Sequence, residues 1–320
     1  MIAILGSGFG LYGYLPALTG GCGQNVVLPE KYRSRLSERP ELSPFTDRVQ
    51  WAEDEAAALR SADGVVIALR PSDQAEWASE CLTLSNLKYL LLEKPLASSP
   101  EAAATLDYEL DRSRKVIRVG YTFAYTAWGR QLLDACPRTR EKARLSIEWS
   151  FPAHYHTFDL RNWKRFTASG GGAIRFYGIQ LIALLAKIGY CDVIFSRSFG
   201  PSAEELFRWT ALFEGPTLPQ CEIMVDTTAP VGKFCVDLQP RNGPRLDGFL
   251  LEQSDPFASR AEAGQSEELD RRVPILVELC RTAWQPSMDE SSWYKATIDL
   301  WRVTEEKTRF EMSGEKMVGT

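Results

Sequence analysis

The sequence predicts an α/β protein with a parallel sheet covered by helices in its N-terminal part, followed by an α+β domain with a large, mainly antiparallel, open sheet. In the first part, apolar runs without polar alternation are each followed by a helical pattern, which is typical of parallel strands buried on both faces. In the second part, six strand-like runs follow one another, as expected of antiparallel pairing. For 320 residues we expect two domains, residues 1–120 and 121–320.

Composition excludes several classes of partner. The net charge of -5 and the pI near 5.4 argue against nucleic acid and against an anionic membrane, which both need a basic face. The 7 cysteines are widely spaced without a CxxC pair, which favours reduced thiols and no metal site. A strand pattern already begins at residue 2, and the apolar run 180–188 is short, so we expect neither a signal peptide nor a membrane span. These observations predict a cytoplasmic protein with a small-molecule substrate.

The opening residues, MIAILGSGFGLYGYLPAL, form an apolar run, a glycine cluster and a helical pattern. This order is typical of a Rossmann dinucleotide-binding unit, in which bare backbone lets a pyrophosphate approach a helix N-terminus. One frame of the motif uses Gly6, Gly8 and Leu11, and the other uses Gly8, Gly10 and Gly13. We favour the first frame because the turn must follow the strand directly, although Leu11 departs from the expected Gly or Ala. The residues predicted to bind the cofactor here are Gly6, Gly8, Phe9 and Gly10.

A second strand, within NVVLPEKYRSR, is predicted to end near Leu28. Glu30 follows 24 residues beyond Gly6, where an acidic group can bind the adenosine ribose hydroxyls. Arg33 lies at the same site, together with Lys31 and Arg35. A carboxylate favours NAD and an arginine favours the 2′-phosphate of NADP, so we expect NADP or NAD with a preference for NADP. A solvated charged turn is the alternative.

Three more strands are predicted to end near Leu69, before Glu93, and near Gly120, in ADGVVIALRPSD, LKYLLLEKPLA and KVIRVGYTFAY. Ligands of open parallel sheets bind beyond the carboxyl ends of the strands. The further candidate cofactor ligands are therefore Leu69, Arg70, Pro71, Gln74, Glu93 and Lys94.

Together, Gly6-Ser7-Gly8, Ala68–Pro71, Glu93-Lys94-Pro95, Gly120-Tyr121 and Gly170–Ala173 resemble motifs of the Gfo/Idh/MocA family of oxidoreductases, over most of the chain. The resemblance implies a Rossmann domain and a second domain whose open sheet forms a homodimer or homotetramer. It also implies NAD or NADP and a sugar, cyclitol or nucleotide-sugar substrate. It places Lys94 near the nicotinamide and the reacting hydroxyl, and we assign Tyr121 to substrate binding.

The helix after the glycines departs from the family pattern. The family typically has an Asp and, four residues on, a His, where this sequence has Phe176 and Gln180. Neither side chain titrates near neutral pH, which excludes proton transfer by the usual His. Three alternatives remain for the proton transfer. Tyr177 could donate the proton together with Lys94, or Lys94 and a water molecule suffice while Gln180 orients the substrate. In the third alternative the site is redox-silent. We expect glycines 170–172 to lie against a ligand ring, or to allow tight packing of helix on sheet.

The remaining substrate candidates lie in FPAHYHTFDLRNWK. On an extended segment His154 and His156 would point to one face, where one could replace the missing acid; a structural role is the alternative. Arg161 and Trp163 suit an anionic group and a stacked sugar ring, or a solvated loop. The predicted substrate-binding set is Lys94, Tyr121, His154, His156, Arg161, Trp163, Phe176 and Gln180.

The sequence thus predicts an NAD(P)-dependent oxidoreductase acting on a carbohydrate, with Lys94 and Tyr177 as catalytic residues. Reduction of a keto sugar is favoured, because oxidation needs a stronger base than remains without the His. The alternative is a cofactor-binding regulatory or redox-silent protein, and a third hypothesis is an elimination that uses bound nicotinamide transiently.

Overall fold

The computed structural model describes residues 1–139, 143–240, 248–258, 269–283 and 290–313. Contacts divide the chain into two compact units. The first unit comprises Met1–Ala97, Ala102–Thr126 and Ser259–Tyr294, and the second comprises Ser98–Glu101, Ala127–Ala258 and Lys295–Thr320. The predicted ranges 1–120 and 121–320 have one boundary, whereas in the structure the segment Ser259–Tyr294 belongs with the N-terminal residues.

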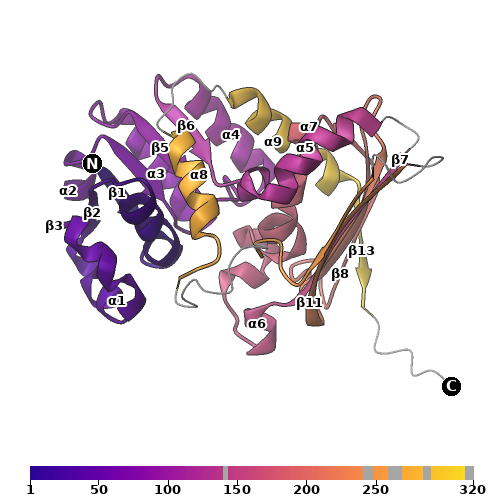
Figure 1. Ribbon diagram of the computed structural model, residues 1–320, viewed down its shortest axis with the longest axis horizontal. Coiled ribbons are helices and arrows are strands. Elements are labelled where there is room, and N and C mark those ends of the chain that lie inside the picture. Colours follow the sequence, from indigo (N-terminus) through magenta and orange to yellow (C-terminus); the bar gives the residue numbers. More distant parts are fainter. Residues whose placement is uncertain (140–142, 241–247, 259–268, 284–289, 314–320) are drawn as a thin grey trace. The chain divides into compact units, whose positions relative to one another are not determined.

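The first unit contains a six-stranded parallel sheet with the strand order β3-β2-β1-β4-β5-β6 (Figure 1). Its strands are β1 Ile2–Leu5, β2 Val26–Pro29, β3 Val49–Ala52, β4 Gly64–Ile67, β5 Tyr89–Leu92 and β6 Val116–Val119. This order is that of the doubly wound dinucleotide-binding fold. The predicted fold class is confirmed, although β4 ends two residues before Leu69 and β3 was not predicted. Strand β3 is a partly exposed edge strand, so it lacks the apolar run that marks β1 and β4.

Helices surround this sheet. The helices and helical turns of the first unit include η1 Gly10–Tyr14, η2 Ala17–Gly21, η3 Glu30–Tyr32, α1 Arg33–Ser37, η4 Pro40–Arg48, α2 Glu55–Arg60, α3 Pro71–Thr83, η5 Thr122–Tyr125 and α8 Val273–Ala283. Helix α4, Pro100–Asp111, also lies mostly in this unit. The segments η1 and η2 form one continuous helical run, called here the first helix. The apolar face of α8 joins Leu11, Leu15 and Leu18 of this first helix in one hydrophobic core. The sequence itself shows a helical pattern from Glu267 to Trp284, which predicts this helix; both ends of that range lie outside the described residues.

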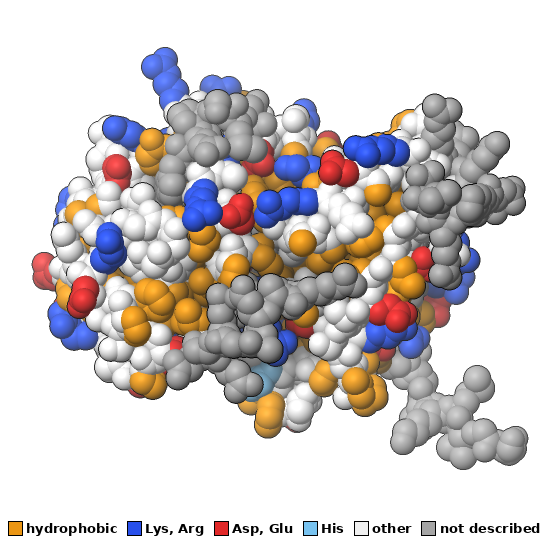
Figure 2. Space-filling model, viewed as in Figure 1, with side chains coloured by type: hydrophobic (Ala, Val, Ile, Leu, Met, Phe, Trp, Pro, Cys, Tyr) orange, Lys and Arg blue, Asp and Glu red, His pale blue; other side chains and the backbone are white. Residues whose placement is uncertain are grey.

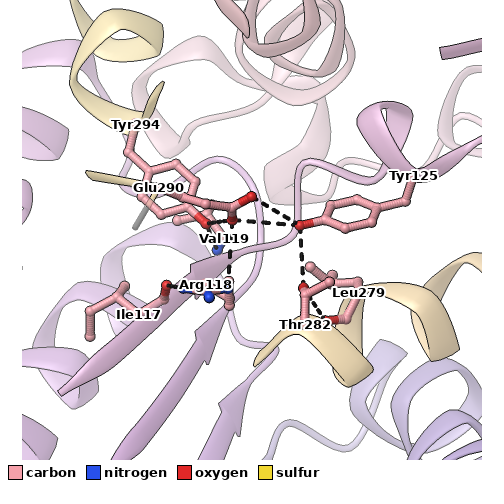
Figure 3. A network of polar contacts seen from close by, with 8 residues as sticks. All are labelled: Ile117, Arg118, Val119, Tyr125, Leu279, Thr282, Glu290 and Tyr294. Carbon is pink, nitrogen blue, oxygen red and sulfur yellow. Dashed lines mark hydrogen bonds and ion pairs between the residues drawn. The ribbon is translucent and has the colours of Figure 1, made fainter. Parts of the chain in front are cut away.

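A buried polar network explains why the apolar strand β6 contains Arg118 (Figure 3). Its Nε lies 3.6 Å from Oε2 of Glu290, and both side chains are almost completely buried. The Tyr294 hydroxyl donates to Glu290 at 2.6 Å and accepts the Val119 N–H at 3.2 Å, while the Tyr125 hydroxyl lies 3.4 Å from Glu290. Buried charges are tolerated when they are paired and hydrogen-bonded. The network therefore ties residues 290–294 to the end of β6 within the first unit.

The second unit contains a seven-stranded sheet with the order β12-β11-β7-β10-β9-β8-β13 (Figure 1). Its strands are β7 Ala143–Pro152, β8 Asp192–Gly200, β9 Arg208–Glu214, β10 Gln220–Asp226, β11 Thr228–Pro240, β12 Phe249–Gln253 and β13 Thr308–Met312. Two neighbouring pairs are parallel, β7 with β10 and β8 with β13, and the other pairs are antiparallel. The predicted antiparallel character and the six predicted strands are confirmed, but β13 was not predicted.

The helices of the second unit include α5 Ala127–Thr139, α6 His154–Thr157, η6 Trp163–Arg165, η7 Thr167–Ser169, η8 Ala173–Gly178 and α7 Ile179–Ile188. Helix α9, Ser291–Glu306, begins in the first unit and continues in the second. The sequence shows a helical pattern from Asp289 to Thr308, which predicts this helix; Asp289 lies outside the described residues. The helical stretch Thr167–Ile188 is long and apolar enough to cross a membrane by length and composition. However, 72% of its apolar window is buried inside the structure, and a buried core helix meets the same criterion.

Candidate functional site

The first glycine-rich turn directly follows β1. Gly6 has a φ of +128°, and a Cβ there would lie 2.2 Å from the carbonyl oxygen of Ala68, so the chain itself requires glycine. The Gly6 N–H donates to the Tyr32 hydroxyl at 3.0 Å. Gly8 is exposed, and a Cβ there would meet no atom of the described chain within 4 Å. The backbone at Gly8 is thus open to a ligand, as the predicted Gly6–Gly8 frame requires.

The two helix glycines have packing roles. A Cβ at Gly10 would lie 2.8 Å from Cγ2 of Ile4, and one at Gly13 would lie 2.4 Å from the ring of Phe9. Phe9 also lies beneath the Arg272 guanidinium, 4.1 Å from its ring centroid. Leu11, where a Gly or Ala was expected, is fully buried in the core. The second frame of the motif is therefore explained by packing.

The two predicted ribose-site residues are paired with each other. Nε and Nη2 of Arg33 donate to the Glu30 carboxylate at 2.6 and 3.0 Å, and both side chains are exposed. These hydrogen bonds lower the pKa of Glu30. The Arg33 guanidinium also lies 4.4 Å from the ring centroid of Trp51.

A cavity of about 470 Å³ lies at the glycine-rich turn after β1. It is lined by Ser7, Gly8, Arg35, Glu38, Arg39 and Glu41. The Arg39 guanidinium lies 3.1 Å from the Glu41 carboxylate and 4.8 Å from the ring centroid of Tyr12. Arg39 was not among the predicted site residues; the only signal for it is that basic residues continue beyond the end of β2.

Three more predicted cofactor ligands surround the carboxyl end of β4. Leu69 is half-buried and Arg70 is exposed, and Pro71 begins α3, where a missing N–H costs no helical hydrogen bond. These positions are compatible with ligand contact, which stays a prediction.

The predicted ligand Gln74 supports the loop after β5. Its side chain is buried, and Nε2 donates to the carbonyl oxygens of Glu93 at 2.7 Å and of Pro95 and Leu96 at 3.2 Å. Its Oε1 accepts the Glu93 N–H at 2.7 Å. Gln74 therefore fixes the backbone that carries Lys94, and direct contact with a cofactor stays a prediction.

Glu93 and Lys94 directly follow β5, at its carboxyl end, and both are half-buried. Oε1 of Glu93 accepts a hydrogen bond from the Tyr14 hydroxyl at 2.5 Å, and Oε2 accepts the Lys94 N–H at 3.2 Å. Burial raises the pKa of Glu93, while the charge of Lys94 and the Tyr14 hydrogen bond oppose that rise. Tyr14 is a residue that the sequence interpretation missed.

Tyr121 is a core residue of the first unit. Its side chain is 1% exposed, and its ring lies 5.7 Å from that of Trp293 and 6.0 Å from that of Tyr294. Burial raises the pKa of its hydroxyl above the ordinary value. Its predicted contact with substrate stays a prediction.

Within the second unit, several predicted residues meet in an aromatic cluster. The ring of Tyr177 lies 4.8 Å from those of Phe151 and Phe176, and Phe176 lies 5.3 Å from Trp163. The Lys164 ammonium lies 5.3 Å from the Phe176 ring centroid. Gln180 follows on the same helical segment and is buried. Trp163, Phe176 and Tyr177 are thus brought together, as a substrate-binding surface requires.

The glycines before this helix are explained by the chain's own backbone. Gly170 and Gly172 have φ values of +81° and +79°. A Cβ at Gly171 would lie 2.4 Å from the carbonyl oxygen of Trp163 and 2.6 Å from that of Lys164. The turn at Trp163–Arg165, rather than a ligand ring or the sheet, excludes a side chain at Gly171.

The histidine prediction is wrong in its geometry. His154 and His156 lie in the helical turn α6, closed by a hydrogen bond from the Thr157 N–H to the Ala153 carbonyl. Residues two apart in a helix point in different directions, so they do not share a face. His154 is exposed, whereas His156 is half-buried, and burial and the charge of Arg165 lower its pKa. The predicted Arg161 is exposed.

On the face drawn in Figure 2, basic and acidic side chains are interspersed rather than gathered by sign. Nucleic-acid binding uses a basic patch or stripe, and the described side chains on this face form neither. The part of the chain that the structure describes also contains no group of three or more His, Cys, Asp or Glu side chains that could hold a metal ion.

The described geometry is that of a two-unit α/β fold found in solved NAD(P)-binding oxidoreductases. KijD10, a 3-ketoreductase from Actinomadura kijaniata solved with NADP and TDP-benzene, has a TM-score of 0.68 and 13% identity over 98% of this chain and 99% of its own. GenD2 from gentamicin A biosynthesis, solved with NAD, has a TM-score of 0.68 and 16% identity over 95% and 94%. An oxidoreductase domain protein from Kribbella flavida has a TM-score of 0.71 and 13% identity over 96% of both chains. No protein-family model and no curated protein matches this sequence.

Proposed function

We propose that this chain is an NAD(P)-dependent oxidoreductase that transfers a hydride between nicotinamide and a carbohydrate, namely a sugar, a cyclitol or a nucleotide sugar. The observation that carries the proposal is the exposed backbone at Gly8, beside a cavity with Arg35 and Arg39, at the turn after the central strand of the parallel sheet. Such a turn is where dinucleotide diphosphates bind in this strand order. The NADP, NAD and TDP-benzene of KijD10 and GenD2 support the same class of cofactor and substrate.

The residues at the turn fit the cofactor. Gly6 allows the tight bend, and the bare backbone of Gly8 precedes the helix that begins at Gly10, where unpaired N–H groups favour a phosphate. Arg35 and Arg39 of the cavity favour NADP over NAD, because a guanidinium binds a phosphate with charge-assisted hydrogen bonds. When bound, NAD(P) supplies or accepts the hydride.

We assign the proton to Lys94. Reduction of a keto sugar adds a hydride to the carbonyl carbon and a proton to its oxygen, and an ammonium can both bind that oxygen and protonate it. Tyr177 is the second candidate donor, and Gln180 is assigned to orient the substrate oxygen by hydrogen bonding. Two KijD10 structures carry a lysine-to-alanine and a tyrosine-to-phenylalanine replacement, which makes the same two residue types the first to test here.

The test mixes the protein with NADPH or NADH and a panel of keto sugars, including nucleotide-linked ones, and follows the absorbance of reduced nicotinamide. We expect consumption by the wild type and its loss in Lys94→Ala with coenzyme binding retained. The matched control is Lys88→Ala, an exposed lysine just before β5, which keeps the activity. Full activity in Lys94→Ala removes this lysine from the mechanism, and the absence of coenzyme binding by the wild type overturns the proposal.

Phe176 and Gln180 favour a second candidate function, a cofactor-binding regulatory or redox-silent protein, because Phe176 packs against Trp163 where the family pattern has a titratable group. Tight NADPH binding without turnover of any carbohydrate would support that function.

The first proposal includes three further statements: membership of the Gfo/Idh/MocA family, a cytoplasmic location, and a homodimer or homotetramer that forms through the second sheet. Sedimentation equilibrium tests the oligomeric state.

A further inference from the structure

Tyr14 links the first helix to the loop that carries Lys94. Its side chain is completely buried, and its hydroxyl lies 2.5 Å from Oε1 of Glu93. Burial and the nearby carboxylate raise the pKa of Tyr14 well above the ordinary value. The hydroxyl therefore keeps its proton at physiological pH and is the donor in this hydrogen bond.

The Glu93 carboxylate is held on both of its oxygens. While Oε1 accepts from Tyr14, Oε2 accepts the Lys94 N–H at 3.2 Å. The backbone on either side is fixed by the buried amide of Gln74. At Gly120, a Cβ would lie 2.9 Å from Oε1 and 3.1 Å from the Tyr14 hydroxyl oxygen, so these two groups occupy the space of a side chain. The carboxylate has a defined position next to Lys94.

The titratable groups that face this pair are Lys94 in the same loop and two residues of the α8 region, Arg272 and Cys280. The ammonium of Lys94 and the guanidinium of Arg272, just before α8, both favour the ionised form of Glu93. Cys280 on α8 faces Tyr14, and its thiol stays protonated because the contact with Cys22 and burial raise its pKa. Burial of Glu93 opposes ionisation. The hydrogen bond from Tyr14 is thus one of the contributions that favour the charged form of Glu93 against the effect of its burial.

We propose that Tyr14 is a positioning residue for Lys94: its hydroxyl holds Glu93 as a carboxylate, and this carboxylate keeps the Lys94 amine in the charged state that can donate a proton. The inference rests on the proposed role of Lys94. An adjacent negative charge favours an ammonium, and loss of that charge favours the neutral amine. In each turnover the proton leaves Nζ of Lys94 for the substrate oxygen and is replaced from water, while Tyr14 and Glu93 keep their own protonation states.

The test measures the protonation of Lys94 without any substrate. Acetic anhydride acetylates an amine only in its neutral form. The acetylation rate of Lys94, measured at each pH by peptide mass spectrometry, therefore gives the midpoint of its deprotonation. The exposed Lys88 is the internal reference. In Tyr14→Phe we expect the Lys94 midpoint to move to lower pH by roughly half a unit or more, and by more in Glu93→Gln. The matched control is Tyr12→Phe, a tyrosine of the same helix, which leaves the midpoint unchanged.

A purely structural Tyr14 gives a different result. In that case Tyr14→Phe lowers the melting temperature but leaves the Lys94 midpoint at the wild-type value, and the proposal is overturned. If Tyr14→Phe does not fold, Glu93→Gln decides: a midpoint at lower pH supports the proposal, and an unchanged one overturns it. Coenzyme binding by the wild type is measured separately, so failure of the proposed function is distinguished from failure of this inference.

Discussion

Alanine at the two turn glycines should separate folding from ligand binding. At Gly6 the structure leaves no room, since a Cβ would lie 2.2 Å from the backbone oxygen of Ala68 and φ is +128°. At Gly8 a Cβ would meet no described atom within 4 Å, and φ lies outside the left-handed range. We therefore expect Gly6→Ala to destabilise the first unit, and Gly8→Ala to fold normally and lose coenzyme.

The magnitudes follow from these contacts. Backbone strain costs about 1–3 kcal/mol, and relief of the overlap with Ala68 brings the total for Gly6→Ala to roughly 3 kcal/mol. For a unit of this size, that lowers the melting temperature by roughly 6–12 °C. An alanine in a permitted conformation stabilises by about 0.4–1 kcal/mol, so Gly8→Ala should melt at or slightly above the wild-type temperature. Loss of one hydrogen bond to a charged phosphate costs about 1.5–3 kcal/mol, which is about 10–150-fold in coenzyme affinity.

Circular dichroism melts and isothermal titration calorimetry with NADPH measure both effects. Wild-type affinity in a well-folded Gly8→Ala variant would show that no diphosphate lies against this backbone. A wild-type melting temperature in Gly6→Ala would contradict the geometry of the turn itself. The reasoning requires the two substitutions to act on different measurements.

Three other predictions follow from the contacts of single side chains. Arg39→Ala should weaken NADPH binding about tenfold or more without changing NADH binding; calorimetry that shows equal losses for both coenzymes would place the 2′-phosphate elsewhere. Arg118→Met should cost roughly 3 kcal/mol of stability in urea denaturation, because Glu290 is left as a buried unpaired charge. Adding Glu290→Gln to this variant should restore part of the lost stability, and purely additive losses would argue against an ion pair between Arg118 and Glu290. The folded-state pKa of His156 is lowered from 6.5, so the unfolded chain binds the proton more readily than the folded chain. The contribution of His156 to stability is therefore complete above about pH 6.5 and is lost as the pH falls. His156→Gln should reduce this acid sensitivity of the melting temperature, and an unchanged pH profile would contradict the prediction.

How much of the fold the sequence predicts depends on burial. Strands β1, β4 and β5 are almost wholly apolar because they are covered on both faces, and they were predicted. Strand β3 is short and partly exposed, so it carries no such run. Strand β13 follows α9 after a single residue, and the helical pattern of α9 conceals it.

The candidate site was predictable where it depends on local sequence. Gly6, Gly8 and Lys94 stand next to strands, and their neighbours along the chain identify them. The hydrogen bond between Tyr14 and Glu93 joins residues 79 positions apart, and no spacing rule reveals such a pair. The histidine segment was misjudged because alternation of residue types cannot distinguish an extended segment from one helical turn.

The return of α8 to the first unit affects how the chain can be made and divided. Its side chains Leu276 and Leu279 fill the core beside the first helix, so a ribosome must release residues up to Ala283 before that core is complete. A fragment that stops at Thr126 would expose the apolar surface that α8 covers and should aggregate. Expression of the nucleotide-binding half by itself therefore calls for grafting residues 269–294 onto it through a linker.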